Sequence, residues 1–382
     1  MRKFKNLISV ILSLSIIISI PVNADASFGN RNNNAEKRNV KILQNDKVCN
    51  EGTKEKIYTM AAAMLKSDGA DAEDIGIGEN ISIYNFDADA LFDIYPILNS
   101  EGECVLVAQV SEDNNVCVNN DTVLYENILD KTDRKGECIV YIDNGVIYAE
   151  NENKQIELKD TGFNGNNEND ISEYTYEEKV DEIVTKEDSV SFSKYDELLC
   201  GALDTDVQED DETLEDEGID FDDFVCGAAS GRCNIKKFMK QGDYYLCWAA
   251  SVATIVNYKK NRNISAKTVA NAMKIGYNDG ATPLQTEKAL NKYGLTYKAK
   301  ESKISWATIK RRISVNDRPF SIALTPLSGG MGHMITGYGY NTFMSGMKMV
   351  EYWDSQGTKG CFPYSSKVTL YGVTYYWFAT VC

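Results

Sequence analysis

The spacing of apolar residues predicts that the ordered part of the chain begins with a helix. Apolar positions in residues 54–66 recur at intervals of three and four, the spacing of one helical face. That face consists of Ile57, Met60, Ala61 and Leu65. An amphipathic helix of this kind needs a partner surface, so we expect it to pack against the segments that follow.

Beyond this helix the apolar pattern changes to short β-prone runs. They cover residues 81–84, 104–110, 137–142 and 145–148. The last two flank Asp143-Asn144, which Gly145 follows, and this order is typical of a tight hairpin turn. Helix and strands together predict a small α+β domain over residues 51–160.

Residues 161–226 show neither the helical nor the strand-like spacing of apolar residues, and they are predicted to be an acidic linker. Within them, residues 204–223 carry twelve acidic side chains and no basic one, so self-repulsion favours an extended segment. Three roles stay open: a solvated linker, a tether that lies against a basic surface, or a calcium loop. The calcium loop is the weakest, because Asp204, Asp206 and Glu215 fit its spacing but Glu209 stands where a turning glycine is needed.

Residues 227–382 are predicted to form a second α+β domain, with helices first and strands second. The helices are expected at 247–260, at 265–273, after Thr282-Pro283 up to Gly294, and at 305–315. The strands are expected at 320–324, 333–340, 348–353 and 373–381. This order predicts a helical half and an antiparallel β half with a cleft between them.

The N-terminus has the pattern of an export signal. Basic residues precede an apolar run at residues 7–20, and small residues follow it up to Ala26. Residues 1–26 are therefore predicted to be a signal peptide, and residues 27–50 a flexible leader rich in Asn, Lys and Arg. No second long apolar run follows, so we expect a secreted, extracellular protein without a membrane anchor.

Charge divides the chain into two halves of opposite sign. Residues 227–382 hold 21 Lys/Arg against 7 Asp/Glu, a net charge of +14, whereas residues 1–226 carry −31. Opposite charges of this size favour association of the two halves. The basic residues are scattered and form no aromatic-interleaved stripe, so no nucleic-acid partner is expected. Ten cysteines in an exported chain permit disulfides, but no metal-ligand spacing is present, and we expect neither metal nor cofactor.

Four residues of the second domain offer a combination suited to acyl transfer. His333 is the single histidine of the chain, and Cys247 stands at the start of a predicted helix whose dipole favours a thiolate. Asp354 could accept a ring N–H of the imidazole and fix its tautomer. Gln241, six residues before the cysteine, could help the backbone N–H of Cys247 to bind an oxyanion.

The arrangement resembles the papain-type cysteine peptidases. The resemblance covers about residues 233–382 and rests on Gln241-x5-Cys247-Trp-Ala before a helix and on Gly332-His-Met-Ile-Thr-Gly-Tyr-Gly339 on a strand. It is greatest to compact bacterial, staphopain-like secreted enzymes. It implies a two-lobed catalytic domain acting on proteins or peptides, with Cys247 as nucleophile, His333 as base, Asp354 as orienter and Gln241 as oxyanion donor.

The same resemblance implies synthesis as a zymogen, with the acidic N-terminal half as an intramolecular inhibitor. Two departures from the family pattern are Asp354, where papain-type enzymes often have Asn, and the missing Gly-Ser-Cys lead-in before the nucleophile. Two alternatives stay open from the residues alone. One is a transglutaminase-like or amidase enzyme with the same Cys-His-Asp order, and the other is a non-catalytic secreted binding protein.

Overall fold

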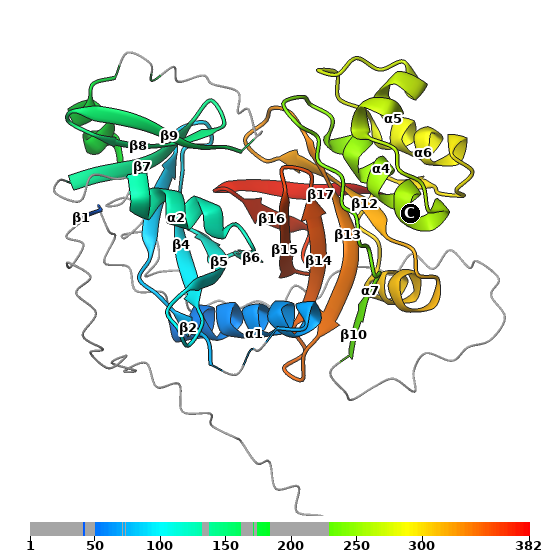
Figure 1. Ribbon diagram of the computed structural model, residues 1–382, viewed down its shortest axis with the longest axis horizontal. Coiled ribbons are helices and arrows are strands. Elements are labelled where there is room, and N and C mark those ends of the chain that lie inside the picture. Colours follow the sequence, from blue (N-terminus) through cyan, green and yellow to red (C-terminus); the bar gives the residue numbers. More distant parts are fainter. Residues whose placement is uncertain are drawn as a thin grey trace, which may run out of the picture. The chain divides into compact units, whose positions relative to one another are not determined.

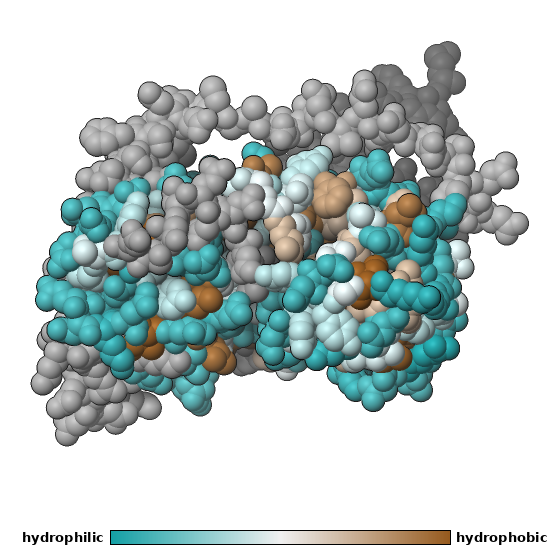
Figure 2. Space-filling model, turned by 90° about the horizontal axis from the view of Figure 1, so that it is seen from above, coloured by the Kyte–Doolittle hydropathy of each residue, from teal (hydrophilic) through white to brown (hydrophobic). Residues whose placement is uncertain are grey.

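The computed structural model describes residues 41–42, 50–70, 72, 74–131, 137–161, 171, 174–183 and 229–382. The predicted signal peptide, most of the leader and the acidic run at 204–223 lie outside these residues. In the described part, helices and strands are mixed as the sequence predicts. No helix there is both long and apolar enough to span a membrane. Seen from above, the coloured surface is largely hydrophilic, with hydrophobic residues in small groups (Figure 2).

The N-terminal part of the fold combines strands with helices (Figure 1). Its elements are β1 (Lys41–Ile42), α1 (Glu51–Asp68), β2 (Gly76–Ile77), β3 (Ile81–Asn85), β4 (Ala90–Leu98), β5 (Cys104–Ser111), β6 (Val116–Asn119), α2 (Thr122–Lys131), β7 (Glu137–Asp143), β8 (Val146–Asn151) and β9 (Lys154–Asp160). β3 to β6 pair antiparallel in order, β7 joins β3 in parallel, and β8 and β9 extend β7 as an antiparallel meander.

Helix α1 forms where the apolar period predicts it. Asn50 caps it by accepting the N–H of Thr53, and Gly69 ends it in the left-handed conformation. The four residues of the predicted apolar face are all buried: Ile57, Met60, Ala61 and Leu65. Burial of one large apolar side chain contributes about 1.5–3 kcal/mol, so packing of this face, more than helix propensity, holds α1 in place.

The predicted hairpin turn is confirmed between β7 and β8. Asn144 and Gly145 both have positive φ, at 50° and 73°, as a two-residue turn of the type that suits Asn-Gly requires. Beyond β9, the described residues of the predicted linker include a helical stretch at 176–183. Ile171 and Ile183 are buried there in a cluster with Tyr84 and Tyr141, so packed structure continues past residue 160.

The C-terminal part places helices α4 to α6 together beside a curved set of strands (Figure 1). Its elements are β10 (Ala229–Arg232), α4 (Cys247–Lys260), α5 (Ala266–Met273), α6 (Pro283–Lys292), β11 (Ala299–Lys300), α7 (Trp306–Lys310), the π-helical turn η2 (Arg311–Val315), β12 (Phe320–Pro326), β13 (His333–Thr342), β14 (Lys348–Asp354), β15 (Thr358–Pro363), β16 (Lys367–Leu370) and β17 (Val373–Val381). The predicted helix at 305–315 is thus half α-helix and half π-helical turn.

Caps in the sequence set the helix boundaries. The side chain of Ser265 accepts the N–H of Thr268 at the start of α5. Thr282 and Gln285 form a reciprocal capping box at the start of α6, which Pro283 opens. The following strands β12, β13, β14 and β15 pair antiparallel in order, and β17 pairs with β12 and β16. This sheet supports the residues considered next.

Candidate active site

Cys247 is the first residue of α4, a helix that is almost entirely buried. Residues 248–257 of this helix are all buried, whereas Cys247 is half-buried at its N-terminal end. Leu246, which precedes it, provides no side-chain cap. The thiol therefore stands at the positive end of a helix dipole, where a thiolate is favoured, on an element that packing holds rigidly.

His333 and Asp354 come together from neighbouring antiparallel strands. His333 opens β13 and Asp354 ends β14, and both side chains are buried. His333 Nε2 lies 3.1 Å from Asp354 Oδ1, which also accepts the backbone N–H of Gln356 at 3.0 Å. Because a carboxylate only accepts, this hydrogen bond requires the proton on Nε2 and leaves Nδ1 for the thiol.

The electrostatic environment of His333 favours its charged form. Burial alone would lower the pKa of the imidazole, but the carboxylate of Asp354 and the thiol of Cys247 outweigh it and raise the pKa to about 10. An imidazolium held beside a sulfur atom stabilises the thiolate, which is the reactive form of cysteine.

The backbone before His333 is tightly constrained. A Cβ atom at Gly332 would lie 2.8 Å from the carbonyl oxygen of Leu324 on β12. His333 itself is opposite Leu324 in the antiparallel register of β12 and β13. Only glycine therefore allows the chain to enter β13 this close to its neighbour, which explains one glycine of the motif around the histidine.

Gln241 precedes α4 and is fixed by three hydrogen bonds. Its backbone N–H donates to the Ser355 carbonyl at 3.0 Å, its Oε1 accepts from Ser355 Oγ at 2.7 Å, and its Nε2 donates to the Tyr244 carbonyl at 2.8 Å. These partners define which end of the amide is nitrogen. Because an amide nitrogen carries two hydrogens, one N–H of Gln241 is left over and can serve as an oxyanion donor.

Ser355 is a residue of this site that the sequence did not single out for a role. It directly follows Asp354 and is buried, so one short segment both orients the histidine and holds Gln241. Its position next to a candidate catalytic residue was the one available signal. A serine at that place is otherwise too common to indicate a function.

We expect Ser355→Ala to lower kcat by about tenfold with little change in KM. The variant leaves Oε1 of Gln241 without its donor, so the amide loses its fixed orientation although Gln241 itself is present. Steady-state kinetics on a peptide substrate would measure the split. Ser366→Ala, a change to another serine of the same part of the chain, serves as the control. An unchanged kcat in Ser355→Ala would show that Gln241 does not depend on this bond.

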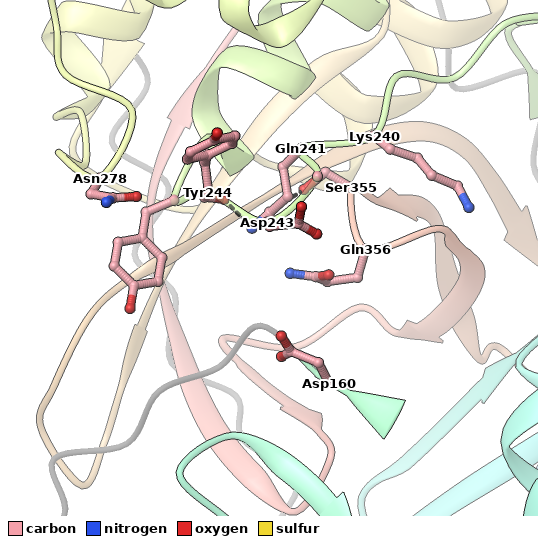
Figure 3. A pocket seen from close by; sticks show the side chains of 10 residues that line it. Asp160, Lys240, Gln241, Asp243, Tyr244, Asn278, Ser355 and Gln356 are labelled. Carbon is pink, nitrogen blue, oxygen red and sulfur yellow. Dashed lines mark hydrogen bonds between the residues drawn. The ribbon is translucent and has the colours of Figure 1, made fainter. Parts of the chain in front are cut away.

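A pocket of about 460 Å³ opens beside Gln241. Its lining residues are Asp160, Lys240, Gln241, Gly242, Asp243, Tyr244, Tyr245, Asn278, Ser355 and Gln356. Figure 3 shows Asp160, at the end of β9, opposite Gln356 and Asp243, whereas the ammonium of Lys240 points away from them. The N-terminal part of the chain therefore contributes one wall of the space next to the candidate oxyanion donor.

The described residues bring no metal-binding cluster to this site. Over the part of the chain that the structure covers, no three His, Cys, Asp or Glu side chains are grouped as a metal ion would require. The seven cysteines found there are all free thiols.

Comparison with known proteins identifies the class. Residues 232–361 match the family described as papain-like cysteine protease AvrRpt2, and the match includes all four candidate residues. The C-terminal part is a papain-like cysteine peptidase domain, and the protein is a cysteine peptidase, a hydrolase of peptide bonds.

Two further comparisons add little. The bromelain protease from Ananas comosus, in a structure with the E64 inhibitor, is 14% identical over 35% of this chain and 97% of that chain. The TM-score between the two structures is 0.24. No curated protein matches the sequence significantly.

Proposed function

We propose that the protein is a secreted endopeptidase, made as a zymogen, that uses a Cys247-His333-Asp354 mechanism. The observation that carries the proposal is the buried His333–Asp354 pair beside a thiol at the start of α4. The imidazole, whose charged form is favoured, is then next to the thiol before substrate binds, and Asp354 keeps the ring in the orientation that directs Nδ1 to sulfur.

The reaction follows from this geometry. The thiolate attacks the carbonyl carbon of the scissile bond, and the resulting oxyanion is bound by Gln241 Nε2 and the backbone N–H of Cys247. When the C–N bond breaks, Nδ1 of His333 gives its proton to the leaving nitrogen. Water then attacks the thioester, passes a proton to Nδ1, and the carboxylic acid departs as the thiolate re-forms.

We further propose that the acidic N-terminal half is an intramolecular inhibitor and that cleavage before Ala229 activates the enzyme. The acidic residues end near Asp223, and β10 at 229–232 pairs with β13, so a cut inside β10 would remove a strand of the peptidase sheet. Cys233, which follows, is 1% exposed and therefore inaccessible. The basic product should have about 150 residues, as the charge boundary of the sequence indicates.

N-terminal sequencing of the processed enzyme tests this proposal. The expected new terminus lies between residues 224 and 229, and activity should rise as the full-length band disappears. The activity assay, repeated with an added primary amine, distinguishes hydrolysis from amine transfer, which is the reaction of a transglutaminase. Full activity of uncut chain would contradict the zymogen, and amine transfer as the main reaction would contradict the peptidase.

A further inference from the structure

The N-terminal part and the peptidase domain share one hydrogen-bonded sheet. β6 pairs antiparallel with β15, with Val118 opposite Cys361 and Asn119 opposite Gly360. The pairing continues at Asn120, whose N–H donates to the Lys359 carbonyl at 3.0 Å and whose side chain accepts the Lys359 N–H at 2.8 Å. Without β6, the edge of β15 would present unpaired backbone groups to solvent.

Apolar contacts reinforce this junction. The buried face of α1 packs in a cluster that contains Met349 of β14 and Cys361 of β15. At the end of α1, Ser67 donates to Glu351, and Arg232 of β10 pairs with both Glu351 and Asp68. The large core of the fold also contains side chains of both parts, from Ile81 to Trp377.

The tip of the β16–β17 hairpin inserts into a polar socket of the N-terminal part. Tyr371 at this tip is buried, and all its hydrogen-bonding groups find partners there. Its N–H donates to Gln109 Oε1 at 2.8 Å, and its carbonyl accepts from Asn85 Nδ2 at 2.9 Å. Its hydroxyl donates to Asp121 Oδ2 at 3.0 Å and accepts from Lys159 Nζ at 3.1 Å.

The socket residues are themselves deeply buried. Asn85, Gln109 and Asp121 are each at least nine-tenths buried, and Lys159 pairs with Asp121 and lies over the Tyr371 ring. Burial and the carboxylate of Asp121 raise the pKa of Tyr371 well above its usual value, so the hydroxyl stays protonated as a donor. Withdrawal of the hairpin would leave several buried polar groups without partners, at a cost of about 1–3 kcal/mol each.

The backbone at Tyr371 has a conformation that a tyrosine rarely adopts. Tyr371 and Gly372 have φ values of 50° and 76°, nearly those of Asn144 and Gly145 in the β7–β8 turn. At the first position of such a turn asparagine is favoured, and a bulky residue with positive φ costs energy. Binding in the socket offsets this strain, and an exposed turn would have no such reason to carry tyrosine.

We propose that the N-terminal domain is a permanent partner of the peptidase domain, anchored by Tyr371, and remains bound after the linker is cut. This inference rests on the processing in the proposed function but not on the catalytic residues. The active enzyme is then a noncovalent complex of two pieces of one chain. The N-terminal piece keeps Asp160 at the pocket beside Gln241. In this account the inhibition depends on the intact connection between the pieces, so cutting it activates the enzyme although the folded N-terminal domain stays bound.

The test uses the full chain as Cys247→Ala, with a site-specific protease sequence inserted between residues 204 and 223. The candidate nucleophile is then absent, so a failed peptidase proposal cannot affect the outcome. After cutting, we expect both pieces to elute together from a sizing column in 0.05 M and in 1 M NaCl. Charge attraction alone predicts separation at the higher salt, and separation in either condition would overturn the proposal.

Variants at the hairpin tip measure the anchor in the cut complex. Tyr371→Phe should raise the Kd between the pieces by about tenfold, because Asp121 loses a buried donor. The matched control is Tyr376→Phe, whose ring is 45% exposed on the same hairpin, and its Kd should change less than about twofold. Tyr371→Asn suits the turn and so preserves the hairpin, yet it should weaken binding by about a hundredfold. Equal Kd values for the cut Tyr371→Asn variant and the cut parent would show that the tyrosine is no anchor.

Discussion

Replacing Cys247 with alanine should lower kcat/KM on a peptide substrate by at least about a thousandfold. Without the sulfur no thioester can form, and the remaining oxyanion donors give only a small fraction of the rate. Because Cys247 is half-buried at the N-terminal end of α4, alanine leaves the helix and its packing intact. Far-UV circular dichroism should therefore match the parent protein.

Cys382→Ala is the matched control for this experiment. Cys382 is also a free, half-buried thiol, but it lies at the end of the chain after β17. Its loss should leave kcat/KM within about twofold of the parent. If Cys247→Ala kept more than about a hundredth of the parent activity, another group would have to be the nucleophile.

Loss of the histidine should be almost as damaging. His333→Ala removes both the cation that stabilises the thiolate and the proton donor for the leaving nitrogen, so kcat should fall by about a thousandfold. No second imidazole can replace it, because His333 is the single histidine of the sequence. An enzyme that retained a tenth of its turnover would place the proton transfer elsewhere.

Asp354→Asn complements His333→Ala, because it separates the effect of the carboxylate charge on His333 from its effect on the orientation of the ring. Asparagine can still accept the Nε2–H of His333, but the carboxylate that raises the histidine pKa is lost, while burial, which lowers it, remains. Activity that needs the imidazolium should extend toward pH 10 in the parent. In the variant the alkaline limb should move to lower pH, by at least about one unit. An unmoved limb would mean that Asp354 only orients the ring.

The same raised pKa links stability to pH. Because the folded-state pKa of His333 is above the ordinary value of about 6.5, its stabilising contribution is complete below that pH. It is lost as pH rises through about 10. The parent should therefore lose stability over this alkaline interval more steeply than His333→Ala.

Helix α1 and the helices of the C-terminal part were predictable because their signals are local, whereas α2 was not predicted. Ser265, Thr282 and Gly294 mark the ends of helices through hydrogen bonds to neighbouring backbone groups. The apolar residues of the buried face of α1 recur at helical spacing. Cysteine, histidine, aspartate and glutamine in order indicate a chemistry because few other uses need that combination. These features depend little on residues far along the chain.

The association of the two parts was not predictable in this way. The sequence charges suggested electrostatic attraction, whereas the described junction consists mainly of the β6–β15 pairing, the apolar face of α1 and the Tyr371 socket, with Arg232–Asp68 as an ion pair across it. Tyr371 and Asp121 are 250 residues apart, and the spacing of residues within one helix or strand cannot indicate such a contact. β15 and β16 also escaped prediction, because short buried strands lack a clear alternation. Whether the acidic run at 204–223 contributes stays a prediction, since it lies outside the described residues.

The most direct test of the central claim is peptide mapping by mass spectrometry after treatment with an epoxysuccinyl inhibitor. The epoxide is opened by a reactive thiolate, and burial raises the pKa of Cys104 and Cys138 to about 11 and of Cys117 to about 12, so these thiols should be inert. We expect one adduct, on Cys247, formed in parallel with loss of peptidase activity and absent from Cys247→Ala. An adduct on another cysteine that accompanies inactivation, with Cys247 unmodified, would contradict the account.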